Sequence, residues 1–274
     1  MRVRQGVLVA MIAAAVVGCP VTSQAQMVLY DDFSSGIIDG VKWFGTDAFG
    51  GTANPTTEII RRIEHGKLRL RLNQYGLTTS NSGTSGGQVR LAFQNPASIT
   101  AIQAGVTILS GEALGCPANA GATVRSRAQL VGGFFNDGSS TGAGDRTGDI
   151  LAFIHKVTDP TVGELMQGGF TRCADATCSS NPTLSAQTFG RTWAPYQAHT
   201  LTLTWDAANH QFVFAAKGAR GPAETFTLPY TQADSASPGL DFKQLSVNNS
   251  AANCSGSRKH AFMDVLFDNV MVNQ

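Results

Sequence analysis

The sequence predicts an all-β protein built as one antiparallel β-sandwich. VLYDDFSSG at residues 28–36 and MDVLFDNVMVN at residues 263–273 have the pattern of a first and a last strand. Between them, apolar and polar residues alternate with period two and no clear helix start occurs. We therefore expect residues 27–274 to form one domain whose two ends meet, a length ordinary for a single sandwich.

Three segments show the alternation most clearly. KLRLRLN at residues 67–73 places three leucines on one face and arginines on the other, which predicts a strand with one buried face. TAIQAGVTILS at residues 100–110 repeats the pattern. HTLTLTW at residues 199–205 is followed by the polar turn DAANHQ and a second apolar run at residues 212–216, so residues 199–217 are predicted to form a hairpin.

Three stretches rich in Gly, Ser and Asn interrupt the predicted strands. They cover residues 78–87, 136–147 and 174–181. Their turn-forming composition leaves little apolar surface to bury, so we expect surface loops.

The first 26 residues are predicted to be a signal peptide. Two arginines precede an apolar run at residues 7–17, and Ser-Gln-Ala ending at Ala25 offers a cleavage site. A competing interpretation is a bacterial lipobox, VVGC, that ends at Cys19. The chain is then exported to the periplasm or extracellular space, or anchored as an outer-membrane lipoprotein through Cys19. The apolar run is too short to span a bilayer, so no transmembrane span is expected after signal removal.

Four further cysteines suit an oxidising compartment. Cys173 and Cys178 flank only ADAT, so a local disulfide is the simplest pairing, and it leaves Cys116 to pair with Cys254. Three pairings of four cysteines remain open. A metal site is disfavoured because no CxxC pair or neighbouring histidine accompanies them.

Charge and motif content exclude several function classes. The chain has 20 Lys and Arg against 19 Asp and Glu, with no basic run, so a nucleic-acid partner is not expected. No HExxH or HxH motif and no GxSxG elbow between a strand and a helix is present, which argues against transition-metal and Ser-His-Asp chemistry. We expect a monomer that requires no cofactor.

An ordered set of motifs carries a family resemblance. The set comprises DDFSSGIIDGVKW, RRIEHGKLRLRL, VGGFFND with GDILAFIHKV, LTLTWDAANHQFVF and VLFDNVMV. Together they resemble the concanavalin A-like lectin/glucanase superfamily over nearly the whole exported part. The resemblance implies a jelly-roll sandwich whose concave sheet carries a ligand cleft, with Trp43 and Trp205 as core residues.

The glucanase branch of this superfamily places Glu, Asp and Glu at alternating positions of one strand. Retaining hydrolysis needs two carboxyl groups about 5–5.5 Å apart. The corresponding strand here, GDILAFIHKV, offers only Asp149, alternating with Leu151, Phe153 and His155. Glu164 lies on the next segment. The sequence therefore predicts that glucanase-type hydrolysis is absent.

Jelly-roll polysaccharide lyases supply a second comparison. The resemblance implies that Arg and Gln neutralise a uronate while His and Tyr move protons. Arg125, Arg127 and Gln129 alternate on one predicted face, and His155 follows on a nearby strand. The chain departs from the pattern, because the lyase Gln-x-His is Phe153-Ile154-His155 here and no Tyr lies in the final strands. The plainer interpretation makes the arginines solvated surface residues and His155 a half-buried spacer.

Aromatic residues could also hold a sugar ring. Trp193 and Tyr196 lie off the predicted core strands and could form a stacking platform. The alternative is a packing role, because aromatic residues make up much of a sandwich core.

A structural Ca²⁺ ion is a separate hypothesis that the resemblance implies. The corresponding positions are Asp31 or Asp32, the turn at Gly66, and Asp268, and carboxylates with carbonyls and water would supply six to eight oxygens. His65 departs from the family, which has an acidic residue or Asn before the glycine. The alternative is that the carboxylates accept hydrogen bonds from the chain.

The sequence thus favours an exported, lectin-like sandwich that binds a glycan or a cell-surface component on its concave sheet without catalysis. The alternatives are a polysaccharide-degrading enzyme, either a lyase or a glycoside hydrolase with an atypical site, and a structural or adhesion module without a small ligand.

Overall fold

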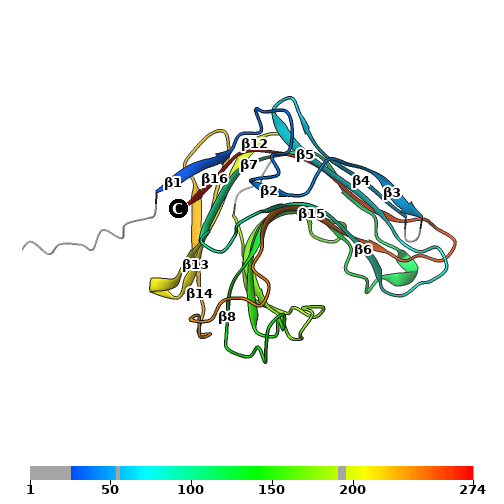
Figure 1. Cartoon of the computed structure of the whole chain (residues 1–274). Coiled ribbons are helices and arrows are strands. Elements are labelled where there is room, and N and C mark those ends of the chain that lie inside the picture. The colour runs from blue at the N-terminus through cyan, green and yellow to red at the C-terminus, as the bar shows by residue number, and fades with distance from the viewer. Residues whose placement is uncertain (1–25, 54–55, 191–195, 274) are drawn as a thin grey trace, which may run out of the picture.

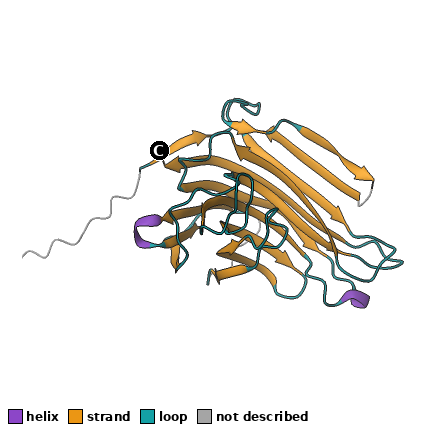
Figure 2. Ribbon diagram, turned by 60° about the horizontal axis from the view of Figure 1, so that its bottom comes forward, coloured by secondary structure: helices purple, strands orange, loops and turns teal. Residues whose placement is uncertain are grey.

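The protein folds into two packed β-sheets. The structure is a computed structural model that describes residues 26–53, 56–190 and 196–273. Figure 1 shows the sheets as two layers of one arch, and Figure 2 shows that strands make up most of the described chain. No helix among these residues is long and apolar enough to cross a lipid bilayer. The predicted all-β antiparallel sandwich is confirmed.

Both sheets are antiparallel throughout. The nine-stranded sheet contains, in spatial order, β14 (Glu224–Pro229), β13 (Gln211–Lys217), β12 (Ala198–Asp206), β7 (Ala101–Ala113), β16 (His260–Asn273), β5 (Lys67–Tyr75), β4 (Thr56–Glu64) and β3 (Ala48–Ala53), with β1 (Met27–Asp31) also paired to β16. The seven-stranded sheet contains β11 (Thr183–Thr188), β10 (Gly163–Arg172), β9 (Asp149–Asp159), β8 (Arg125–Asn136), β15 (Lys243–Ala252), β6 (Thr84–Phe93) and β2 (Trp43–Phe44). Two short 3-10 helices are η1 (Pro117–Asn119) and η2 (Ala207–Asn209).

The first and last strands lie side by side, as the sequence predicts. β1 runs antiparallel to β16, with Met27 opposite Asn273. The turn after β1 is fixed by Asp31, whose carboxylate accepts a 2.8 Å hydrogen bond from the Phe33 amide and a 2.7 Å bond from Trp43 Nε1. Asp31 of the DDF motif therefore holds the turn after β1 and the Trp43 ring together at the start of the sandwich.

One large apolar core lies between the two sheets. Leu68, Leu70 and Leu72 of β5 are fully buried, which confirms the predicted face of that strand. Trp43 is buried, and Trp205 packs against the core in a stack with Phe135 at 5.4 Å. The predicted hairpin is β12 and β13, joined through η2.

One predicted loop is partly wrong. β6 begins at Thr84, so residues 84–87 belong to a strand and not to the loop predicted at 78–87. β6 extends back to Thr84 because the neighbouring strand β15 pairs with it up to Ala252, which lies opposite Thr84. A Cβ on Gly87 would lie 2.2 Å from Gln74 Oε1, so any larger residue there would displace the Gln74 side chain. The loops predicted at 136–147 and 174–181 do connect strands.

Both simplest cysteine pairings are confirmed. Cys116 is bonded to Cys254, and Cys173 to Cys178. Cys19 lies outside the described residues, as does the rest of the predicted signal segment through Ala25.

Candidate functional site

The candidate site is the concave face of the seven-stranded sheet. Figure 1 shows β8, β15 and β6 along the underside of the arch, beneath the nine-stranded sheet. Residues of this sheet that alternate with the core residues face away from the other sheet. On β8, Ala128 and Leu130 belong to the core, so Arg127 and Gln129 face the concave side. The prediction that Arg125, Arg127 and Gln129 share one face therefore holds in the register of β8.

A row of polar side chains crosses this face from strand to strand. In this polar row each residue is the register partner of the next: Arg90 on β6, Ser246 on β15, Gln129 on β8, His155 on β9 and Gln167 on β10. Gln129 Nε2 donates to Ser246 Oγ at 3.1 Å. The fold thus joins Gln129 and His155, which the sequence singles out, with three residues that it does not.

Arg127 and Arg125 lie beside the polar row, on the same strand as Gln129. Arg127 Nη2 donates a 2.8 Å hydrogen bond to Oδ1 of Asn248, whose side-chain amide is uncharged. Within the described part of the chain no carboxylate lies within ion-pair distance of Arg90, Arg125 or Arg127. Burial and the neighbouring Arg125 lower the pKa of Arg127 to about 10. The concave face therefore carries positive charge that no acidic side chain neutralises.

His155 is the most enclosed ionisable group of the polar row. Its exposed fraction is 2%, so the expectation of a half-buried spacer is wrong. The imidazole stacks on Phe153 with ring centroids 4.5 Å apart, and its Nε2 lies 3.2 Å from Gln167 Oε1. Burial first, and then the charges of Arg127 and Arg125, lower its pKa to about 3. His155 is therefore neutral at physiological pH.

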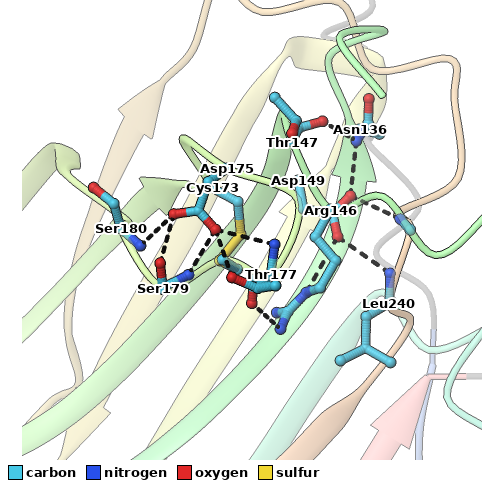
Figure 3. Close-up of a disulfide and its surroundings, with 12 residues drawn as sticks. Asn136, Arg146, Thr147, Asp149, Cys173, Asp175, Thr177, Ser179, Ser180 and Leu240 are labelled. Carbon is cyan, nitrogen blue, oxygen red and sulfur yellow. Dashed lines mark hydrogen bonds and ion pairs between the residues drawn. A yellow bond between two sulfur atoms is a disulfide. The ribbon is translucent and has the colours of Figure 1, made fainter. Parts of the chain in front are cut away.

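Asp149 lies at the other end of β9, where its side chain accepts hydrogen bonds from the neighbouring loops. Its side chain is fully buried, and its oxygens accept hydrogen bonds from the Gly239 amide at 2.7 Å, the Leu240 amide at 3.1 Å and Asn136 Nδ2 at 2.8 Å. Figure 3 shows this carboxylate among the loops around the Cys173–Cys178 disulfide. The structure does not bring it to Arg127 and His155.

The positions that the glucanase resemblance assigns to carboxylates are not acidic here. β9 presents Leu151, Phe153 and His155 to the concave side after Asp149, because Ala152 and Ile154 belong to the core. Glu164 is on β10, where its Oε2 lies 2.9 Å from Lys156 Nζ. A pair of carboxylates at glycosidase spacing is therefore not formed by these residues.

The predicted aromatic platform is only partly described. Trp193 lies outside the described residues. Tyr196 is 70% exposed and therefore does not belong to the buried core.

The carboxylates assigned to calcium are engaged by the chain itself. Asp268 Oδ2 lies 2.6 Å from Lys67 Nζ, next to the turn at Gly66. Asp32 Oδ1 accepts the Ser34 amide at 3.0 Å. The described residues contain no group of three or more His, Cys, Asp or Glu side chains placed to hold a metal ion. An ammonium group thus takes the place of a cation beside Asp268, which does not fit a calcium clamp, and calcium binding stays a prediction.

Comparisons with known proteins give fold-level likenesses alone. No protein-family model matches the chain, and no curated protein matches it significantly. Among solved structures, a winged bean acidic lectin in complex with methyl-α-D-galactose is 12% identical, with 92% of this chain and 100% of the lectin covered and a TM-score of 0.43. A β-1,3-glucanase from Mycobacterium marinum is 13% identical, with 92% and 99% covered and a TM-score of 0.43. Lectin II from Ulex europaeus is 13% identical, with 82% and 97% covered and a TM-score of 0.37.

Lectins and glucanases are the two kinds of protein that the sequence resemblance names. No activity or ligand of this chain follows from identities and TM-scores this low.

Proposed function

We propose that this protein is an exported glycan-binding protein that holds a saccharide on the concave face of the seven-stranded sheet without cleaving it. The observation that carries the proposal is the polar row. Side chains from five adjacent strands meet there, and they offer amide, hydroxyl, imidazole and guanidinium groups. Saccharides bind to such faces through many directional hydrogen bonds supported by apolar contact.

Apolar surface lies next to the polar row. The Phe153 ring lies above Gly169 on β10, where a Cβ would come within 2.9 Å of the ring. A glycine at that position lets the ring lie close against the sheet. The face of the Phe153 ring that lies away from the stacked His155 imidazole could take the C–H face of a sugar ring.

Exchange of Gln129 for alanine tests this proposal. Screening the full chain against a glycan array identifies a ligand, and titration calorimetry then compares the wild type with Gln129→Ala. We expect affinity to fall at least tenfold, because Gln129 lies at the centre of the row. Gln103→Ala is the matched control, since Gln103 lies on β7 of the other sheet and should leave affinity unchanged. Equal affinities for the wild type and Gln129→Ala would refute the proposal.

A second candidate function is β-elimination by a polysaccharide lyase. The observation that favours it is the convergence of Arg127, Gln129 and His155 on adjacent strands, with the His155 imidazole neutral and able to accept a proton. Against it, β6, β8, β9, β10, β11 and β15 contain no tyrosine. Unsaturated products absorbing near 235 nm on incubation with acidic polysaccharides would establish this candidate, and their absence would leave binding alone.

Export is part of the proposal. Two disulfides among the described residues are typical of proteins that fold in an oxidising compartment. Processing at Ala25 and lipid modification at Cys19 are distinguished by the mass of the mature N-terminal peptide.

A further inference from the structure

The segment between β1 and β2 presents three large apolar side chains to solvent. Val41 is 80% exposed, Ile37 71% and Phe44 67%. They are three of the four most exposed large apolar side chains among the described residues, and all fall in one stretch, residues 37–44, which we call the apolar turn. Apolar side chains exposed singly are ordinary, whereas several on one element indicate a surface that contacts another molecule or a membrane.

The apolar turn is anchored to the sandwich from inside. Ile38 and Trp43 pack into the apolar core, one on each side of the residues that reverse the chain direction. Asp39 closes this reversal, because its carbonyl oxygen accepts the Trp43 amide at 2.9 Å and its carboxylate accepts the Val41 amide at 2.9 Å. The two core residues and these hydrogen bonds therefore fix the turn with its apolar side chains outside the core.

The apolar area of the turn is too small for a stable protein partner or a second copy of the chain. A specific interface between proteins buries about 800 Å² on each partner. Even a fully buried aromatic side chain contributes only about 150–250 Å², so three partly exposed apolar side chains fall short of that area. Attachment to a lipid bilayer has no such minimum, because it strengthens with each apolar side chain that leaves water.

The length of chain that precedes β1 also favours a bilayer. The lipobox interpretation places a lipid on Cys19, which lies outside the described residues. Eight residues separate Cys19 from Met27, and a chain of that length spans at most about 28 Å. The five residues of β1 add about 17 Å, and the chain then enters the apolar turn. A lipid on Cys19 would therefore keep the turn within reach of the same bilayer.

We propose that the apolar turn is a membrane-contact element, which inserts Ile37, Val41 and Phe44 at the boundary between the head groups and the acyl chains of a lipid bilayer. Residues 31–47 contain four Asp and one Lys, so attraction to anionic lipids does not drive this contact. Removal of apolar surface from water drives it, and neutral lipids are sufficient. The proposal does not depend on glycan binding. It places the edge strand β2 of the seven-stranded sheet beside the membrane.

Flotation with phosphatidylcholine vesicles tests the proposal on the exported chain that begins at Gln26 and carries no lipid. We expect the wild type to float with the vesicles. The triple variant Ile37→Ser/Val41→Ser/Phe44→Ser should lose tenfold or more of the partition coefficient. Val162→Ser is the matched control, since Val162 is 63% exposed in the turn between β9 and β10. Melting temperatures of the variants should equal that of the wild type, because the exchanged side chains lie outside the core.

A dye that reports the polarity of its surroundings then locates the contact. It is attached to the thiol of Val41→Cys, at the most exposed of the three positions, and separately to that of Val162→Cys. We expect the emission of the dye at position 41 to shift to shorter wavelength and to brighten when vesicles are added. The emission at position 162 should not change. A change at position 162 alone would contradict insertion of the apolar turn.

Four outcomes would overturn the proposal. The first is a wild type that stays out of the vesicle fraction, and the second is a triple variant that floats as well as the wild type. The third is binding only to vesicles that also contain phosphatidylglycerol, with loss at high salt, which would assign the contact to exposed cations such as Arg90. The fourth is a dimer in sedimentation experiments that the triple variant abolishes, which would assign the apolar turn to a second copy of the chain.

Discussion

Arg127 and His155 are ionisable side chains of the concave face that the fold encloses. Arg127 and His155 are enclosed with unpaired polar atoms, and no acidic side chain of the described chain neutralises the arginine. Alternation in RSRAQ already predicts that Arg125, Arg127 and Gln129 share a face. The sequence does not predict how deeply His155 is buried, because that depends on the curvature of the sheet and on Phe153.

A buried neutral histidine makes stability depend on pH. The folded-state pKa of His155, about 3, lies below the ordinary value near 6.5, so the unfolded chain binds the extra proton between these values. Stability is therefore lost as the pH falls below about 6.5. Between pH 7 and pH 5 we expect His155 to lower the free energy of unfolding by roughly 2 kcal/mol.

Urea denaturation at both pH values, on the wild type and His155→Gln, measures this contribution. The variant should lose about that much less stability on acidification, since glutamine does not titrate. The comparison cancels His199, whose pKa burial also lowers. A parallel loss of stability in the two proteins would show that His155 is not held neutral by burial.

The role of Asp149 is tested by removing one acceptor. Asp149→Asn keeps the shape but replaces a carboxylate oxygen with a donor that faces backbone amides and Asn136. We expect a loss of about 1–3 kcal/mol in the free energy of unfolding and unchanged glycan affinity. Asp47→Asn is the control, because Asp47 is exposed. Unchanged stability with lost affinity would place Asp149 in the binding site instead.

At the scale of strands, the sequence predicts which residues of a strand share a face, but it does not predict which strands lie side by side. QVRLAF in β6 and QLSVN in β15 carry the same period-two signal as β8, and it could have placed Arg90, Ser246 and Asn248 on the outer face. Nothing local predicts that β15 lies between β6 and β8. That strand order results from long-range packing of two curved sheets. The polar row therefore could not be predicted from the sequence and is established by the structure.

Close packing of the two sheets constrains β10. A Cβ on Gly168 would lie 2.5 Å from Cδ1 of Phe214, on the opposite sheet, so the core has no room for a side chain there. We expect Gly168→Ala to lower the free energy of unfolding by about 1–3 kcal/mol. Gly142→Ala is the control, because no atom lies within 4 Å of the position that a Cβ would take there. Thermal or urea unfolding checks both, and equal stability of the two variants would contradict this packing.

At the scale of the whole molecule, the first and last strands pair as predicted. The two disulfides differ in the length of chain that each one closes. Cys116–Cys254 closes a sequence separation of 138 residues, whereas Cys173–Cys178 closes a separation of 5. A longer closed loop removes more entropy from the unfolded chain. The long-range bond should therefore matter more to overall stability, and the short one mainly to the loops around Asp149.

Paired serine variants measure the difference. Replacing Cys116 and Cys254 should cost about 5 kcal/mol of unfolding free energy, and replacing Cys173 and Cys178 about 2 kcal/mol. Urea denaturation under non-reducing conditions compares the two double variants with the wild type. A larger cost for the short-range pair would contradict the loop-entropy explanation.

The most direct test of the concave-face site is an NMR titration that follows the ring protons of the histidines while a glycan ligand is added. His155 lies in the polar row, whereas His260 lies on β16 of the other sheet and His65 in the turn between β4 and β5. We expect the His155 resonance to shift in proportion to the bound fraction while those of His65 and His260 stay in place. Saturation of the protein with ligand without any change at His155 would contradict a binding site on the concave face.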